Sequence, residues 1–322
     1  MLNESVLDLD YEKEADRICN FMRDSLRTKL KRRGLVVAVS GGIDSTCSVA
    51  LAVRALGKDK VFCLRLPEQD STDATGDRSQ ILVEHLGVNY ETHIIAGTLE
   101  SIGCYKRRDE AIKKVFPKYD GWKNKIVLKG GLEGKYNHFN LVVQTPDGEL
   151  LEERLPLNEY LTIVAATNYK QRIRKTVEYF HADRLHYAVV GTPNRVEYDQ
   201  GFFVKNGDGS ADIKPIAHLY KLQVYGMARY LGVPELVCDS VPTTDTYSLS
   251  QGQDEFYFAL PYKEMDYALW AHNHKVPAHE LAVFLGTSEA QAELVYKDIE
   301  TKRRTTAYMH AQPYLVENVL DV

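Results

Sequence analysis

The chain has 322 residues, of which 44% are hydrophobic and 26% are charged, and its formal net charge is −5 at pH 7. This length and balance predict a soluble globular protein with a large core. The acidic balance argues against a protein that binds along nucleic acid, because such binding needs a basic surface. No apolar run approaches the roughly 20 residues of a membrane span, and the first ten residues lack the pattern of a signal peptide. The five cysteines form neither a CxxC pair nor a metal-binding spacing, so we expect reduced thiols in a cytoplasmic protein with no membrane partner.

The first hundred residues alternate predicted helices with predicted strands. Apolar residues at helical spacing indicate the helices, and short apolar runs bounded by glycine or proline indicate the strands. The predicted helices cover 11–31, 45–56 and 73–86, and the predicted strands cover 35–39, 61–66 and 90–96. Strands that alternate with helices of this length are typical of right-handed crossovers in a parallel sheet.

Residues 103–165 interrupt this alternation. A basic stretch precedes a predicted β-hairpin, in which 139–145 and 149–155 flank the turn at 146–148. We therefore interpret 103–165 as an insertion. The alternation then returns, with helices predicted over 167–182, 221–231 and 288–304 and a strand over 185–190.

These elements predict an α/β fold: a doubly wound parallel sheet flanked by helices, with an inserted β-hairpin. We expect a single domain over 1–322, with the insertion at about 103–165 and a C-terminal helical segment at about 265–322.

The strongest chemical signal is the string at 40–45, Ser-Gly-Gly-Ile-Asp-Ser, between the first predicted strand and the next helix. Ligands of open parallel sheets bind at the carboxyl ends of the strands. Gly41 and Gly42 let the backbone approach an anion, the helix start offers free N–H groups, and Ser40 and Ser45 add hydroxyls. Asp44 would repel a phosphate unless a cation lay between them, which makes it a candidate Mg²⁺ ligand. The alternative is an ordinary strand–turn–helix junction with Asp44 as a cap.

This string resembles the PP-loop of the ATP pyrophosphatase superfamily. Its members share the attack of a nucleophilic oxygen on the α-phosphate of ATP, with release of pyrophosphate. The string matches neither GxGxxG nor GxxxxGK[ST], so the fingerprints of Rossmann dinucleotide sites and Walker NTPases are absent.

Motifs in the second half narrow the resemblance to one family. They are the stretch from Gly191 to Glu197, the stretch from Gly201 to Asp212, Lys221 after Leu219-Tyr220, the run 242–245, Asp254-Glu255, and Lys302-Arg303-Arg304. Together they resemble the NAD synthetase family of the ammonia-dependent type. The resemblance covers roughly 10–100 and 165–305 and leaves out the insertion. It implies the sheet order 3-2-1-4-5 and a homodimer.

The second half also supplies charged residues for a phosphate site. Glu197 follows a strand end on the same sheet edge as Asp44, so it is a candidate second ligand of Mg²⁺. Lys205 and Lys221 are candidates to neutralise the charge of departing pyrophosphate. Each of these side chains is otherwise an ordinary solvated surface group.

The resemblance implies roles for further positions. Those assigned to ATP binding are Ser40, Gly41, Gly42, Asp44, Ser45, Arg174, Thr192, Lys221 and Thr243. Those assigned to the second substrate are Asn168, Arg172, Tyr179, Phe202, Lys205, Asp212, Glu255 and Lys302. Lys205, Lys221 and Lys302 are the candidate catalytic residues, and Asp44 and Glu197 are the candidate metal ligands. Thr301 departs from the family pattern, which often has His there.

The implied reaction is the ATP-dependent amidation of the nicotinate carboxylate of deamido-NAD, through an acyl adenylate, with AMP and pyrophosphate as co-products. The chain shows no glutaminase segment, so we expect ammonia to be used directly or supplied by a separate partner. Three alternatives stay open: a PP-loop amide ligase for a different carboxylic acid, a tRNA-modifying enzyme, and a nucleotide-binding sensor without catalysis. The scattered cysteines and the net charge disfavour the tRNA enzyme.

Overall fold

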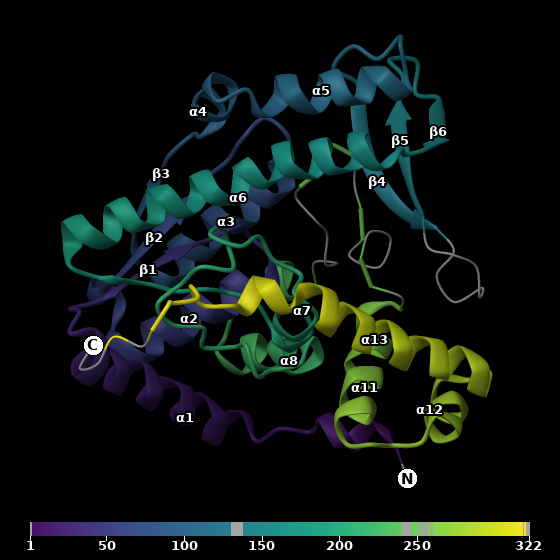
Figure 1. The fold of residues 1–322 in the computed structure, drawn as a ribbon. Helices are drawn as coiled ribbons and strands as arrows, with labels where there is room; N and C mark the ends of the chain where they lie inside the picture. Colours follow the sequence, from purple (N-terminus) through teal and green to yellow (C-terminus); the bar gives the residue numbers. More distant parts are fainter. Residues whose placement is uncertain are drawn as a thin grey trace.

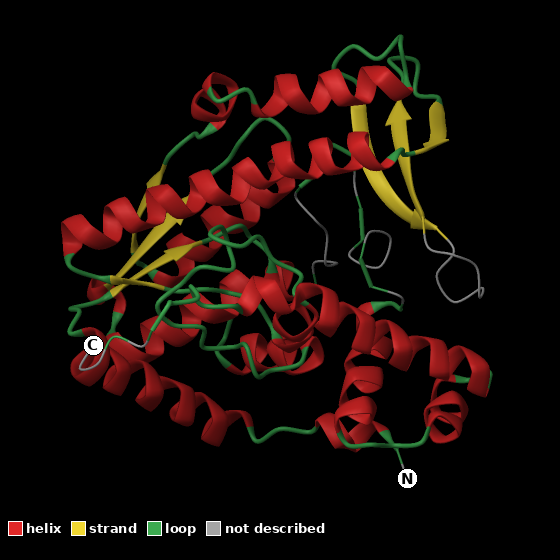
Figure 2. Cartoon of the chain, viewed as in Figure 1, coloured by secondary structure: helices red, strands yellow, loops and turns green. Residues whose placement is uncertain are grey.

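The computed structural model describes residues 2–129, 138–239, 246–249, 251–252, 257–258, 260–317 and 319. Its elements form a central sheet covered by helices, a smaller sheet at one end, and a group of C-terminal helices (Figures 1 and 2). Within these residues no helix is long and apolar enough to cross a bilayer.

The central sheet is parallel, in the order β3-β2-β1-β7. Its strands are β1 (Leu35–Ala38), β2 (Val61–Arg65), β3 (Asn89–Thr92) and β7 (Ala188–Val189). The first four positions of the expected order are therefore confirmed. In the described residues the fifth position is reduced to one parallel bridge between Val190 and Ile213.

Helices cover both faces of this sheet. Successive side chains of β1 point to opposite faces, and both sets are apolar, so both faces must be buried. Leu35 and Val37 belong to one core cluster, with residues of α1 (Tyr11–Asp24), α2 (Ile43–Leu56) and α8 (Lys221–Tyr230). Val36 and Leu64 belong to another, with residues of α4 (Ala96–Ser101), α5 (Cys104–Val115) and α6 (Leu157–Leu185). The predicted doubly wound α/β fold is thus confirmed.

The insertion contains a helix and a three-stranded antiparallel sheet. The predicted hairpin is confirmed as β5 (His138–Gln144) and β6 (Leu150–Arg154), with Gln144 opposite Leu150. Helix α5 and strand β4 (Lys123–Lys129), which pairs with β5, were not predicted. The lysine-rich composition of both segments conceals their apolar positions, of which Ile112 and Ile126 are fully buried.

Several predicted boundaries were wrong. The strand predicted over 185–190 covers only Ala188–Val189, and the helix predicted to end at 304 runs to His310. The helix predicted from 167 begins at Leu157, directly after Pro156, because its first turns pack on the rest of the insertion. The third strand ends at Thr92, because the chain turns there toward α4. The first helix gives way to a π-helical turn, Ser25–Leu30.

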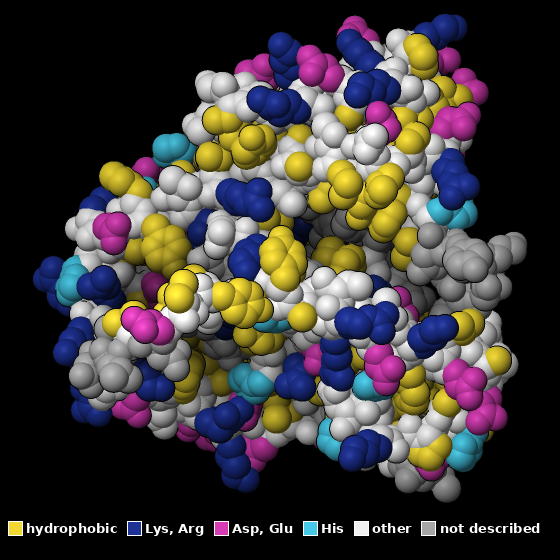
Figure 3. Space-filling view, viewed as in Figure 1, with side chains coloured by type: hydrophobic (Ala, Val, Ile, Leu, Met, Phe, Trp, Pro, Cys, Tyr) yellow, Lys and Arg dark blue, Asp and Glu magenta, His cyan; other side chains and the backbone are white. Residues whose placement is uncertain are grey.

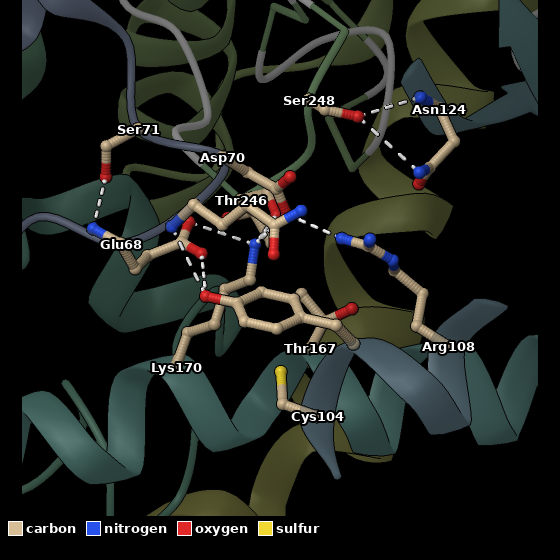
Figure 4. A network of polar contacts seen from close by, with 12 residues as sticks. Glu68, Asp70, Ser71, Cys104, Arg108, Asn124, Thr167, Lys170, Thr246 and Ser248 are labelled. Atoms are coloured by element: carbon tan, nitrogen blue, oxygen red, sulfur yellow. Dashed lines mark hydrogen bonds and ion pairs between the residues drawn. The ribbon is translucent and has the colours of Figure 1, made fainter. Parts of the chain in front are cut away.

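A buried charge cluster joins the insertion to the loop after β2 (Figure 4). Lys170 Nζ of α6 lies 3.0 Å from Glu68 Oε1 and 2.5 Å from Asp70 Oδ2, and donates to the carbonyl of Thr246 at 2.9 Å. Arg108 Nη1 of α5 lies 2.6 Å from the same Asp70 oxygen. We call Glu68, Asp70, Arg108 and Lys170 the joint cluster. It ties α5, α6 and the segment at 246–249 to the edge of the central sheet.

The C-terminal helices form a core of their own. Met265 and Leu269 of α11 (Tyr262–Asn273) pack with Leu281 of α12 (Ala278–Leu285) and Val295 of α13 (Glu289–His310). The Ser288 hydroxyl accepts a bond from the backbone of Gln291, so the predicted capped start of the last helix is confirmed. The other helices within the described residues are η1 (Glu4–Leu7), η3 (Lys58–Lys60), α3 (Asp73–Leu86), α7 (Arg195–Gln200) and α9 (Glu235–Cys238).

All five cysteines are buried, and none forms a disulfide. Burial raises the pKa of the Cys63 thiol to about 12 and that of Cys104 to about 11. The expectation of reduced thiols therefore fits the structure.

Candidate active site

The loop at 40–45 forms an anion-binding turn at the carboxyl end of β1. Gly42 caps α2 without any side-chain hydrogen bond, so no side chain competes for the first N–H groups of this helix. The hydroxyls of Ser40 and Ser45 lie 3.2 Å apart beneath the turn. Gly41 has φ +81°, and a Cβ atom there would lie 2.6 Å from the carbonyl of Thr75. The positive φ and the short distance both require glycine at position 41, where the loop backbone packs closely against α3.

Two carboxylates and one ammonium group meet beside this loop. The Lys221 ammonium, at the start of α8, pairs with Asp44 Oδ2 and lies 3.9 Å from Glu197 Oε1. Asn194 Nδ2 donates to Asp44 Oδ1 at 3.2 Å. We call Asp44, Asn194, Glu197 and Lys221 the carboxylate cluster. Its members come from α2, the turn after β7, α7 and α8, so only the folded sheet edge assembles it.

The electrostatics of Lys221 follow from its surroundings. Burial by itself disfavours the ammonium form, but Asp44 and Glu197 outweigh it and raise the pKa of Lys221 above its ordinary value. The charged form is therefore held firmly between the two carboxylates.

The donor set fits Mg²⁺ that arrives with phosphate ligands. Asp44 and Glu197 lie close enough to share one cation, because the Lys221 ammonium approaches both. No group of three or more His, Cys, Asp or Glu side chains arranged to hold a metal occurs in the described part of the chain. Mg²⁺ is usually held by one or two carboxylates together with substrate phosphates, which matches this set.

Residues of α6 form a second group. Arg174 Nε donates to the carbonyl of Leu66, just after β2, at 3.3 Å. Arg172 Nε donates to the carbonyl of Lys205 at 3.3 Å. The Tyr179 hydroxyl donates to Asp212 Oδ1 at 3.3 Å, and burial, with Asp212 nearby, raises the pKa of Tyr179 to about 12. The structure thus brings Tyr179 and Asp212 together, as two candidates for the second substrate.

Lys205 and Lys302 have other partners than the loop at 40–45. Lys205 Nζ donates to the carbonyls of Tyr308 and Ala311, at 2.7 and 3.0 Å, and so binds the end of α13. Lys302 pairs with Asp298 one turn earlier on α13, and its ammonium lies 5.0 Å from the ring centroid of Tyr257. Phe202 packs against that ring at 4.7 Å, which is the behaviour of a core aromatic.

The remaining candidates are less connected. Thr192 follows β7 on the carboxyl edge and is partly exposed, and Asn168 is a partly buried residue of α6. Thr243 and Glu255 lie outside the described residues.

Three residues near the site were missed. Asn194 and Asp266 line a small cavity of about 10 Å³ beside Lys221. Asp266 accepts the backbone N–H groups of Lys221 and Leu222, at 3.1 and 2.7 Å. Arg78 Nε of α3 donates to the carbonyl of Gly41 at 3.3 Å. The pattern Asn-x-x-Glu at 194–197 signals a helix cap. Asp266 follows Asp254-Glu255 in a stretch that resembles the family, but no role was predicted for it, and nothing in the sequence links Arg78 to this loop.

The face of the molecule in Figure 3 is hollowed between α6 and α13, and hydrophobic side chains gather over the start of α6 beside the hollow. Leu157 and Leu161 are exposed there.

A family model described as NAD synthase matches residues 14–116 and 141–312 of the chain. The chain belongs to the NAD synthase family. The residues between the two matched segments, 117–140, lie inside the expected insertion and include β4.

Curated relatives within this family cover most or all of the chain. One is the NH(3)-dependent NAD(+) synthetase of Rhizobium meliloti (strain 1021), which is 51% identical over 100% of this chain and 97% of its own length. Another, from Thermotoga neapolitana, carries the same name and is 39% identical over 78% of this chain and 81% of its own length. The Rhizobium relative therefore aligns with the insertion as well.

Solved structures show the same fold at lower identity. The NMN synthetase from Francisella tularensis has a TM-score of 0.65 at 21% identity and covers 97% of this chain and 100% of its own. The NH3-dependent NAD synthetase from Campylobacter jejuni, in complex with the nitrate ion, has a TM-score of 0.60 at 21% identity and covers 96% and 100%. At this identity they establish the α/β fold of the family.

Proposed function

We propose that the protein is an ammonia-dependent NAD synthetase, which converts deamido-NAD, ATP and ammonia into NAD, AMP and pyrophosphate. The observation that carries this proposal is the carboxylate cluster next to the start of α2, where no side chain makes a capping hydrogen bond. The names of the Rhizobium and Thermotoga relatives support the choice of acid and of nitrogen source.

The loop at 40–45 would bind the triphosphate through the first N–H groups of α2. Asp44 and Glu197 would hold Mg²⁺, which when bound neutralises phosphate charge. Lys221 is placed to stabilise the negative charge that builds as pyrophosphate leaves. The nicotinate carboxylate attacks the α-phosphorus, and ammonia then attacks the acyl carbon of the adenylate. Positioning and electrostatics supply most of the acceleration of the reaction, because this mechanism uses no covalent bond between the protein and a substrate.

On the acid side we propose that Tyr179, Asp212 and Arg172 contact deamido-NAD. We also propose that Lys205 and Lys302 contact substrate, although Lys205 donates to a carbonyl at the end of α13 and Lys302 pairs with Asp298. In this proposal they exchange those partners for substrate when it binds. Arg174 and Thr192, both at the carboxyl edge of the sheet, are proposed to contact ATP.

We further propose a cytoplasmic homodimer that takes ammonia from solution or from a separate supplier, with neither nucleic acid nor membrane as a partner. These points rest on the resemblance to the family and on the net charge of −5.

The test is an assay of the purified chain with ATP, Mg²⁺ and deamido-NAD, with either ammonium or glutamine as nitrogen source. We expect AMP, pyrophosphate and NAD with ammonium, and no NAD with glutamine. Asp44→Ala and Glu197→Ala should each lower pyrophosphate release at least 100-fold, the scale seen when one charge-stabilising group is lost. The circular dichroism spectrum should stay that of the wild type, whereas the melting temperature should fall, because the buried Lys221 ammonium loses a partner. ADP and orthophosphate as products would refute the chemistry, and turnover of another carboxylic acid alone would refute the substrate.

A further inference from the structure

Asn194 and Lys221 each contact a different oxygen of the two candidate metal ligands, Asp44 and Glu197. Its side-chain N–H donates to Asp44 Oδ1 at 3.2 Å, and its backbone N–H donates to Glu197 Oε2 at 3.2 Å. Lys221 faces the other oxygen of each carboxylate, Asp44 Oδ2 and Glu197 Oε1. Each carboxylate therefore has one oxygen on Asn194 and the other turned toward the shared ammonium.

The orientation of the Asn194 amide is fixed from its other end. Its Oδ1 accepts the backbone N–H groups of Val196 and Glu197, at 3.0 and 3.1 Å. Since the oxygen must face these donors, the NH₂ group must face Asp44. The side chain is 1% exposed, so water does not compete for these bonds.

We infer that Asn194 is a positioning residue, which sets the two carboxylates at the relative orientation needed to share one divalent cation. This inference rests on the proposed function, because it concerns the same metal site. Asn194 would act through its hydrogen bonds, by holding Asp44 of α2 and Glu197 of α7 at a fixed orientation to each other. Removal of a residue that hydrogen-bonds to a metal ligand typically weakens metal affinity 10- to 100-fold.

The Asn194 side chain caps α7 and also donates to Asp44, and Asn194→Ser tests these two roles separately. Serine is as good a helix cap as asparagine, so α7 should form normally in Asn194→Ser. The shorter side chain has no amide to reach Asp44, so that carboxylate loses its fixed orientation. Asn194→Thr, which also caps a helix and also lacks the amide, serves if the serine variant does not fold.

The experiment measures Mn²⁺ binding by the full-length protein, from the free Mn²⁺ signal in electron paramagnetic resonance. It uses an ATP analogue with a methylene bridge between the α- and β-phosphorus, so no turnover occurs. We expect Asn194→Ser to raise the dissociation constant for Mn²⁺ about tenfold. In the steady state, the apparent KM for Mg²⁺ should rise while that for ammonia stays unchanged. Ser288→Ala, which removes the equivalent cap from α13, is the matched control and should leave Mn²⁺ binding at the wild-type value.

Two outcomes would overturn the inference in different ways. If Asp44→Asn loses Mn²⁺ binding but Asn194→Ser binds as wild type, the metal site stands and the role of Asn194 is refuted. If Asp44→Asn also binds Mn²⁺ as wild type, the metal site itself is refuted, and the inference falls with it.

Discussion

Asp266 is the buried carboxylate that holds the start of α8. Its two oxygens accept the N–H groups of Lys221 and Leu222, and its side chain is fully buried. Burial raises the pKa of Asp266 from its ordinary value of 3.8 to about 7, although these hydrogen bonds oppose the shift. The backbone position of Lys221 therefore depends on a group that titrates near neutral pH.

Asp266 should make the free energy of unfolding depend on pH. Between pH 4 and pH 7 the folded chain keeps a proton that the unfolded chain has lost. Its contribution to stability is therefore complete below pH 4, falls as the pH rises to 7, and is level above it. We expect the loss between pH 5 and pH 8 to be on the order of 2 kcal/mol. Urea unfolding at the two pH values measures it. Asp266→Asn, which does not titrate, should show a smaller decline, and equal declines would contradict this assignment.

At the scale of residues, motif position predicted Asp44, Glu197 and Lys221, which the fold brings together. No role was predicted for Asp266, because its place in the sequence does not show that its carboxylate accepts the backbone N–H groups at the start of α8. The same reasoning did not foresee that Lys205 binds the end of α13. A spacing pattern describes one element, whereas these contacts depend on how two elements pack.

At the scale of elements, the starts of the strands in the central sheet are tightly packed around Gly34. Gly34 lies just before β1, between Lys60 before β2 and Tyr187 before β7. A Cβ atom at Gly34 would lie 2.4 Å from the Lys60 carbonyl and 2.5 Å from the Tyr187 ring. A backbone atom cannot turn aside as a side chain can, so the strands themselves would have to shift.

We expect Gly34→Ala to lower the free energy of unfolding by about 1–3 kcal/mol, the usual cost of overpacking. Gly97→Ala is the matched control, since Gly97 lies in α4 and a Cβ atom there would meet nothing within 4 Å. Alanine at that helical position should be neutral or stabilising by up to about 1 kcal/mol. Equal unfolding curves for the two variants would show that the start of the sheet is looser than described.

The helices and strands of the central sheet could be predicted because their apolar runs end at clear breakers, such as Gly57 and Gly87, which end α2 and α3. Boundaries set by tertiary packing could not. The first turns of α6 carry the exposed Leu157 and Leu161 and are stabilised by contact with the insertion. No local periodicity marks their start.

At the scale of the whole molecule, the joint cluster fastens the insertion to the central sheet. Lys170 and Glu68 are almost completely buried, and Lys170 faces two carboxylates and a carbonyl oxygen. A buried charge that loses its partner is costly, because nothing else solvates it.

Removal of the Lys170 charge should therefore destabilise the molecule strongly. We expect Lys170→Met to lower the free energy of unfolding by about 3–5 kcal/mol, because Glu68 and Asp70 would stay buried with less compensation. Lys13→Met breaks the exposed ion pair with Asp10 and should cost less than about 1 kcal/mol. Chemical denaturation of both variants tests this, and similar losses would mean that the joint cluster contributes little.

The sheet order and the place of the insertion could be predicted from family resemblance and from the break in alternation. The joint cluster could not, because its four charged residues come from three separate segments of the chain. Each of them, taken alone in the sequence, is typical of a solvated surface group.

The burial of all five thiols has a practical consequence for spectroscopy. Thiol reagents react with the exposed thiolate, and the native cysteines are both enclosed and shifted to high pKa values. One cysteine introduced at an exposed position, such as Val283 on α12, should therefore accept a fluorophore or spin label selectively. The wild-type background can stay intact, so the C-terminal helices can be followed by a single-site label.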